Sequence, residues 1–239
     1  MSGEPVDELV APVATDPVPD LVEHILGGAQ YISPSYWLGW VAEQVTGTNP
    51  WQWIADQYGG DWASVQRGGV ALQHLGEFGV GYGTAVKGGV EGLAHSWTGV
   101  AAGAAGTYFT GFGTAVKDQK VDLDGMGVQL VQTATGMYQT ASAIKGLWET
   151  LLDLLIAMAA EAAAAAASSW TIVGPIAAGA AFALTLTKAI GVWGQVLNAH
   201  TAVWNAAQGL VGILAGYLSG LHDLDAHALP AASYDHPGA

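Results

Sequence analysis

The stretch "GLAHSWTGVAAGAAG", residues 92–106, separates two long helical patterns, and the fold depends on how this stretch is interpreted. Its centre is the tripeptide Trp97-Thr98-Gly99. A second Trp-x-Gly tripeptide at 37–39 follows Ser-Pro-Ser and is soon ended by Pro50, so the tripeptide alone is not informative. Only Trp97-Thr98-Gly99 lies between two proline-free helical patterns. This context predicts the turn of a helical hairpin, in which Thr98 caps the second helix and Gly99 lets the backbone bend. A buried Trp97 that locks the turn is an adequate structural alternative.

The segment before this turn has the periodicity of a long helix. From Asp61, a candidate N-cap, to Trp97 there is no proline. Apolar and aromatic residues recur mostly three, four or seven positions apart, at Val65, Leu72, Leu75, Tyr82, Val86, Val90, Leu93 and Trp97. This spacing predicts an amphipathic helix of roughly 50 Å that packs through these side chains.

Glycines are unusually frequent in the same segment. Each glycine inside a helix costs about 1 kcal/mol relative to alanine, so a broken helix is one interpretation. The other is that the glycines let helices approach closely, because many are seven residues apart. We predict a helix-packing seam, formed by Gly69, Gly76, Gly83, Gly106 and Gly113.

After the turn the helical pattern resumes, and the chain as a whole is predicted to be all-α. The expected architecture is a long helical hairpin or elongated four-helix bundle with a Trp-x-Gly turn, followed by an Ala/Gly-rich helical C-terminal half. The expected segments are a disordered acidic leader (1–19), short N-terminal helices (20–60), the hairpin (61–160), an apolar helical hairpin (161–222) and a disordered tail (223–239).

Composition excludes several classes of function. The net charge is −14, from 20 acidic and 6 basic residues, which disfavours nucleic acid and anionic membrane surfaces as partners. The chain has no cysteine, so disulfides, Cys-zinc sites and thiol catalysis are excluded. The N-terminal residues lack the basic start and apolar run of a Sec signal peptide, so we expect none.

The C-terminal half is long and nearly free of charge. Residues 162–187 carry no charged side chain, and 189–222 carry none apart from two histidines, so either stretch is long enough to cross a bilayer. Gly212, Gly216 and Gly220 form a small-xxx-small repeat. Alanine and glycine are only weakly apolar, however, and basic residues are too scarce to set a topology. We therefore expect a buried hairpin packed against 61–150 or an oligomeric interface, with membrane insertion as the alternative.

No catalytic, cofactor-binding or metal-binding residue is predicted. The motifs of serine hydrolases, zinc proteases and nucleotide-binding proteins are absent from the sequence. His74 and His95 share a helix face without a third ligand, and Glu161 is interpreted as a solvent-facing or helix-paired carboxylate. The tail residues His222, Asp223, Asp225 and His227 are typical of a solvated acidic tail rather than a metal site. The sequence thus predicts a protein that is not an enzyme.

Residues 51–160 resemble the WXG superfamily of small secreted helical-hairpin proteins, and more closely its larger actinobacterial, PPE-like members. The resemblance rests on Trp97 and Gly99, on the helix lengths around them, and on the continuation through Ala101, Ala102 and Ala105. It implies export by the type VII (ESX) secretion system without a Sec signal, to the medium or the cell envelope. It also implies assembly through helices, with a second copy or a small WXG-type partner, and contact with the secretion machinery.

One feature of that superfamily is missing. None of the tyrosines is followed four residues later by Asp or Glu, so the Tyr-x-x-x-Asp/Glu export signal is not present. Export would then rely on a partner's signal, or the chain is a relative that is not itself exported. The expected function is that of a non-enzymatic helical protein of type VII secretion, a substrate or secretion partner. The alternative is a membrane-inserted or pore-like protein that uses residues 150–222.

Overall fold

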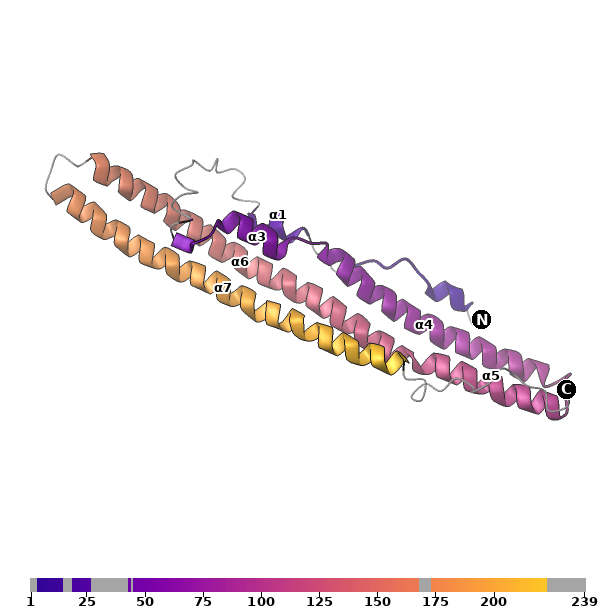
Figure 1. The fold of residues 1–239 in the computed structure, drawn as a ribbon. Helices are drawn as coiled ribbons and strands as arrows, with labels where there is room; N and C mark the ends of the chain where they lie inside the picture. The colour runs from indigo at the N-terminus through magenta and orange to yellow at the C-terminus, as the bar shows by residue number, and fades with distance from the viewer. Residues whose placement is uncertain (1–3, 15–18, 27–42, 44, 168–172, 223–239) are drawn as a thin grey trace. The chain divides into compact units, whose positions relative to one another are not determined.

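A computed structural model describes residues 4–14, 19–26, 43, 45–167 and 173–222 of the chain (Figure 1). All regular structure in these ranges is helical, which confirms the all-α class. The elements are η1 (Pro5–Glu8), α1 (Leu21–Leu26), α3 (Pro50–Tyr58), α4 (Trp62–Leu93), α5 (Val100–Asp118), α6 (Lys120–Ala167) and α7 (Val173–His222). The second Trp-x-Gly tripeptide and the predicted tail (223–239) lie outside the described residues.

Local sequence explains where these helices begin. The Asp20 carboxylate accepts hydrogen bonds from the backbone N–H groups of Val22 and Glu23, which caps α1. Asn49 does the same for α3 through the N–H of Gln52, and Pro50 occupies the first helical position. The polar run at 117–125 produces only a short break, because Gln119 between α5 and α6 keeps helical dihedral angles.

The chain forms two compact units, and α6 and α7 run through both. The first unit comprises 1–17, 63–134 and 207–239, and the second comprises 18–62 and 135–206. Neither unit is one continuous stretch of sequence, whereas the segments expected from the sequence are consecutive. The predicted boundary at 160–161 falls inside α6, where an unbroken run of strong helix formers continues the helix to Ala167.

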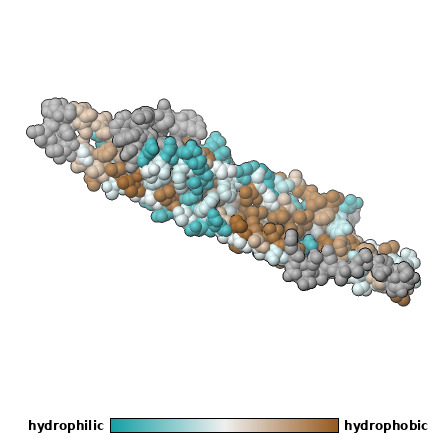
Figure 2. Space-filling view, viewed as in Figure 1, coloured by the Kyte–Doolittle hydropathy of each residue, from teal (hydrophilic) through white to brown (hydrophobic). Residues whose placement is uncertain are grey.

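In the first unit, the buried face of α4 consists mostly of glycine. Its buried residues are Gln66, Gly69, Gly76, Gly79 and Gly83. The large side chains that periodicity assigned to the packing face include Leu75, Tyr82 and Leu93, which are 43%, 40% and 55% exposed. That assignment is wrong for these three residues, because a glycine stripe lets the backbones approach and thereby turns the bulky side chains outward. Figure 2 shows hydrophobic residues at the molecular surface.

The N-terminal strap, residues 4–14, lies along α4. Pro5 packs on Gly81, where an added Cβ would be 3.3 Å from the proline Cα. Farther along, His74 Nδ1 is 3.0 Å from the carbonyl oxygen of Val10. The prediction of a disordered leader is therefore wrong for these residues. The contact between Pro5 and Gly81 requires neither a capping motif nor a periodic apolar pattern. The sequence of the leader therefore did not predict that it packs on α4.

The second unit has a heptad-spaced core. On α6 the buried residues alternate four and three positions apart: Met137, Ala141, Ile144, Trp148, Leu151, Leu155 and Met158. Ala189, Trp193, Val196 and His200 follow the same spacing on α7. Such spacing gives knobs-into-holes packing between long helices. The short helices α1 and α3 add Leu21, Ile25, Ile54 and Tyr58, all 1% exposed or less.

Candidate functional site: the hairpin connection and the glycine seam

The connection between α4 and α5 is short and is built on backbone hydrogen bonds. The N–H groups of Ser96 and Trp97 both donate to the carbonyl oxygen of Leu93, at 3.0 and 2.8 Å. Gly99 has φ +106°, a backbone angle that side-chain-bearing residues rarely adopt, and it occupies the N-cap position of α5. The expectation that Thr98 caps this helix is therefore wrong, since the cap is one residue later and has no side chain.

Trp97 itself is partly exposed. Its exposed fraction is 42%, so the alternative of a buried tryptophan that locks the turn does not hold. The indole instead borders a cavity of about 340 Å³ between the ends of α4 and α5. The lining residues are Val90, Leu93, Ala94, Trp97, Thr98, Gly99, Ala102, Gly103, Ala105, Gly106 and Phe109.

This cavity is suited to an apolar guest. None of its lining residues is ionisable, and its volume is at the small end of the range for ligand sites in proteins. Trp97 and Phe109 supply aromatic surface, while glycines leave the backbone accessible. Such a cavity can accept an aromatic or aliphatic side chain from another helix, but its residues offer no group for acid–base or nucleophilic chemistry.

The glycine seam joins α4 to both α5 and α6. Gly83 of α4 and Gly113 of α5 lie against each other's backbone, and an added Cβ at Gly69 would be 2.6 Å from the carbonyl oxygen of Gly127 on α6. An added Cβ at Gly76 would be 3.1 Å from an Asp124 carboxylate oxygen. The contacts at Gly69, Gly83 and Gly113 require glycine, since real Cβ atoms do not tolerate contacts under 3 Å, whereas an added Cβ at Gly76 would be tight against side chains only.

Two details of the seam differ from the predicted set of five glycines. An added Cβ at Gly106 would be 3.8 Å from a methyl carbon of Val90, so this glycine makes no close backbone contact. It lines the cavity instead. Gly79 is buried in the seam but was not predicted, because it follows Gly76 by three residues rather than seven. Spacings that alternate between three and four residues mark a helix-packing stripe, and this pattern would have predicted Gly79 as a member of the seam.

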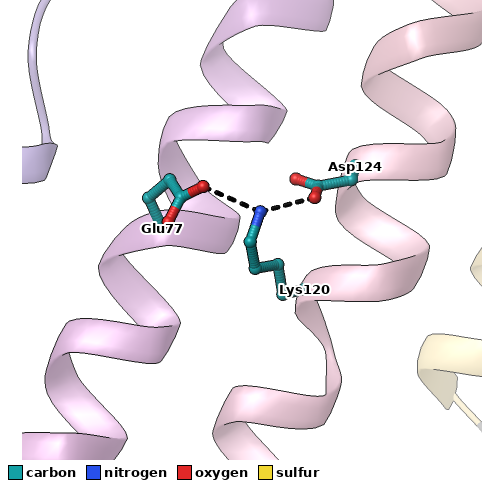
Figure 3. Close-up of polar contacts among 3 residues, drawn as sticks. All are labelled: Glu77, Lys120 and Asp124. Atoms are coloured by element: carbon teal, nitrogen blue, oxygen red, sulfur yellow. Dashed lines mark hydrogen bonds and ion pairs between the residues drawn. The ribbon is translucent and has the colours of Figure 1, made fainter.

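A charged cluster links α4 to α6 beside the seam (Figure 3). Lys120 Nζ is 2.8 Å from Glu77 Oε1 and 2.5 Å from Asp124 Oδ2. Hydrogen bonds to Asp124 and then to Glu77 raise the pKa of Lys120 above its usual value. The i,i+4 spacing of Lys120 and Asp124 is visible in the sequence, but the bridge to Glu77 depends on how α4 and α6 pack.

The second unit contains an aromatic cage, formed by Trp53 and Tyr58 of α3 and Trp204 of α7 around the His200 ring. Ring centroids lie 5.0, 5.6 and 5.8 Å from that of His200. The Tyr58 hydroxyl and His200 Nδ1 share a hydrogen bond of 3.3 Å. Burial raises the pKa of Tyr58 and lowers that of His200. This cage was not predicted from the sequence, because its α3 residues and its α7 residues are more than 140 positions apart.

Other polar residues singled out from the sequence have structural partners. Glu161 Oε1 accepts a hydrogen bond of 3.0 Å from the Thr185 hydroxyl on α7, so this carboxylate is helix-paired. His74 contacts the strap, and His95 lies in the α4–α5 connection. Within the described ranges no group of three His, Cys, Asp or Glu side chains is placed to hold a metal ion. Of the four tail residues, only His222 is described, at the end of α7.

Two helical stretches, Val100–Ala167 and Ala177–Leu221, are long and apolar enough to cross a membrane, judged by length and composition. Core helices of globular proteins often meet the same criterion, but they are mostly buried. Here only 22% and 17% of the most apolar windows are buried. Within Ala177–Leu221 the buried residues are Ala189, Trp193, Val196, His200 and Leu210, so one stripe of this helix is buried and the rest is exposed or half-buried. Gly212 and Gly216 have no neighbour within 4 Å where a Cβ would be.

No protein-family model, curated protein or solved structure matches the chain.

Proposed function

We propose that this protein is a non-enzymatic helical protein of the type VII secretion system, an exported substrate or a secretion partner that acts through helix–helix assembly. The observation that carries the proposal is the inverted burial of α4. Four of its glycines, Gly69, Gly76, Gly79 and Gly83, are buried inside the unit, whereas Leu75, Tyr82 and Leu93 are exposed. A face of this kind gains apolar contact when another helix covers it.

The cavity at the α4–α5 connection supports the same proposal. It lies at the end of the hairpin, next to the exposed side chains of Leu93 and Trp97, and its lining is free of charge. A partner helix that covers this face would place one apolar side chain in the cavity as an anchor. Deeply inserted anchors of this kind supply much of the binding energy at protein interfaces.

The proposed partner is a second copy or a small WXG-type hairpin. Since the chain lacks a Tyr-x-x-x-Asp/Glu signal, a partner that carries this signal would also explain export. The acidic balance of −14 favours a partner that is less acidic than this chain.

Fractionation of the native host, with and without its type VII secretion ATPase, tests the proposal. We expect the protein in the medium or at the cell surface of the normal strain, and inside the cell when the ATPase is absent. The same distribution in both strains would refute a role as an exported substrate. Co-purification with a small helical hairpin would separate a secretion partner from an exported substrate.

A membrane-inserted or pore-like protein is the second candidate, favoured by the low burial of Val100–Ala167 and Ala177–Leu221. Uncovered apolar helices gain free energy from transfer into lipid, although glycine and alanine make that gain small per residue. Protein that stays in a carbonate-washed membrane pellet in both strains would support this candidate over the first. Release by carbonate would exclude it.

A further inference from the structure

The aromatic cage attaches α3 to α7. Trp53 packs edge to face against Trp193, with ring centroids 5.2 Å apart, and against His200. Tyr58, at the last position of α3, is fully buried and shares its hydroxyl with His200. His200 thus contacts α3 at two positions, Trp53 in the middle of the helix and Tyr58 at its end.

The helix α3 depends on this attachment. It has nine residues, and isolated helices of that length are not stable in water. Ile54 and Tyr58 of α3 are fully buried. Loss of the contacts with α7 would therefore leave α3 held by its contacts with α1 and would remove much of its helical order.

We propose that His200 is a proton-operated latch, so that protonation of its ring releases α3 from α7 and uncovers Trp193 and the adjoining face of α7. Neutral His200 fits the cage, because its ring is surrounded by aromatic side chains and is only 9% exposed. A charged imidazolium in the same place would lose most of its hydration. Cation–π attraction to the cage offsets part of that loss.

Among the described residues, no charged group is a cause of the His200 pKa shift. The charged and titratable groups on the described helices of this unit are Glu23 and His24 on α1, Asp56 on α3, Tyr138, Lys145, Glu149, Asp153 and Glu161 on α6, and Lys188 on α7. The remaining titratable neighbour is Tyr58, whose phenol stays neutral as burial raises its pKa. Burial is the only cause that shifts the His200 pKa, and it lowers it.

The sign of the pH effect follows from that direction. Released His200 binds a proton near its ordinary pKa of about 6.5, whereas docked His200 binds one only at lower pH. Docking is therefore at full strength above about pH 6.5. As the pH falls below this value, the docking equilibrium weakens by up to about tenfold per pH unit, until the docked ring is protonated as well.

Hydrogen exchange of the α3 amides, measured by mass spectrometry on the full chain at pH 7.5 and 5.5 and corrected for intrinsic rates, tests the latch. We expect protection in 50–58 to fall by up to about tenfold at pH 5.5 in the wild-type chain, while protection in α4 stays unchanged. His200→Phe keeps an aromatic ring that cannot be protonated, and should abolish the loss. His74→Phe is the same substitution in the other unit, and this variant should still lose protection in α3 at pH 5.5.

Equal protection at both pH values in the wild-type chain, or an equal loss in His200→Phe, would overturn the proposal. His200→Gln, which keeps a neutral hydrogen-bonding side chain, serves as a second variant where the phenylalanine prevents folding. An NMR titration of His200 in the wild-type chain gives an independent answer. A His200 pKa at or above 6.5 in the docked state would also overturn the latch.

Discussion

At the scale of single residues, the glycines of α4 fall into two groups that intrinsic helix propensity does not distinguish. Gly83 lies against the backbone of Gly113, whereas Gly88 has nothing within 4 Å of the position of its missing Cβ. Both are inside the same helix and have the same intrinsic propensity cost. Packing alone decides which of them the fold requires.

A matched pair of alanine substitutions tests this distinction. Gly83→Ala should destabilise the chain by about 1–3 kcal/mol, because the added methyl forces the α4 and α5 backbones apart. Gly88→Ala should instead stabilise it by up to about 1 kcal/mol, through improved helix propensity. Chemical unfolding monitored by circular dichroism measures both. A loss of stability in both variants would contradict the seam.

The connection between α4 and α5 gives a second prediction at this scale. Gly99→Val should cost about 1–3 kcal/mol, because φ +106° is strained for a β-branched residue. Trp97→Ala should cost less stability, since the indole is 42% exposed, but it should weaken partner binding by removing a wall of the cavity. Unfolding curves and pull-down assays separate these effects. Unchanged stability and partner binding in both variants would contradict the role of this connection.

At the scale of elements, the heptad stripe of α6 is expected to carry the stability of the second unit. Leu151→Ala should cost about 2–5 kcal/mol, as for other fully buried leucines. Leu184→Ala on α7 is the control, since Leu184 is 68% exposed and its loss should cost under about 0.5 kcal/mol. Thermal unfolding of both variants tests the difference. Similar costs would mean that the stripe is not the core.

The cluster of Lys120, Glu77 and Asp124 ties α4 to α6 with a modest pH-dependent contribution. The pKa of Lys120 is raised in the folded chain. The contribution of Lys120 to the free energy of unfolding is therefore complete below about pH 10 and is lost as the pH rises through the folded-state pKa. Glu77→Gln with Lys120→Met forms a double-mutant cycle. We expect a coupling of under about 1 kcal/mol at pH 7, because all three side chains are partly exposed. No coupling at pH 7, or an unchanged coupling at pH 11, would contradict this bridge.

Periodicity predicted the existence of the helices better than their orientation. The break at residues 94–99 and the glycine seam were visible because a helix face repeats every three or four residues. The outward orientation of Leu75, Tyr82 and Leu93 on α4 was missed, since apolar periodicity assigns large side chains to the packing face, although here the glycines are the points of contact. The cage around His200 was not predictable, because α3 and α7 meet only through tertiary packing.

At the scale of the whole molecule, the described residues leave apolar surface on both units. Leu75 and Tyr82 in the first unit and Ile190 and Trp204 in the second are exposed. Such surface is typical of proteins that assemble. It is the common basis of the secretion-partner proposal and of the membrane alternative.

The purified chain without its partner should therefore self-associate. We expect the weight-average mass in sedimentation equilibrium to rise with concentration in the micromolar range. Leu75→Gln combined with Tyr82→Gln should reduce this rise, while Glu149→Gln, at an exposed polar position, should not. A purely monomeric wild-type chain would argue against these residues as an assembly surface.

The seam between Gly83 and Gly113 also affects how the helices of the first unit can move. Interdigitated side chains resist sliding along the helix axis, because each knob must climb out of its hole. Gly83 and Gly113 present backbone to each other and add no such resistance, so their contact sets the distance between α4 and α5 while the short connection at 94–99 sets their axial position. The bridge from Lys120 to Glu77 is anchored at one height on α4 and favours one register of α6 against it. Loss of that single cation would weaken this preference for one register by no more than the modest coupling of the bridge, while the glycine contacts keep the helices together.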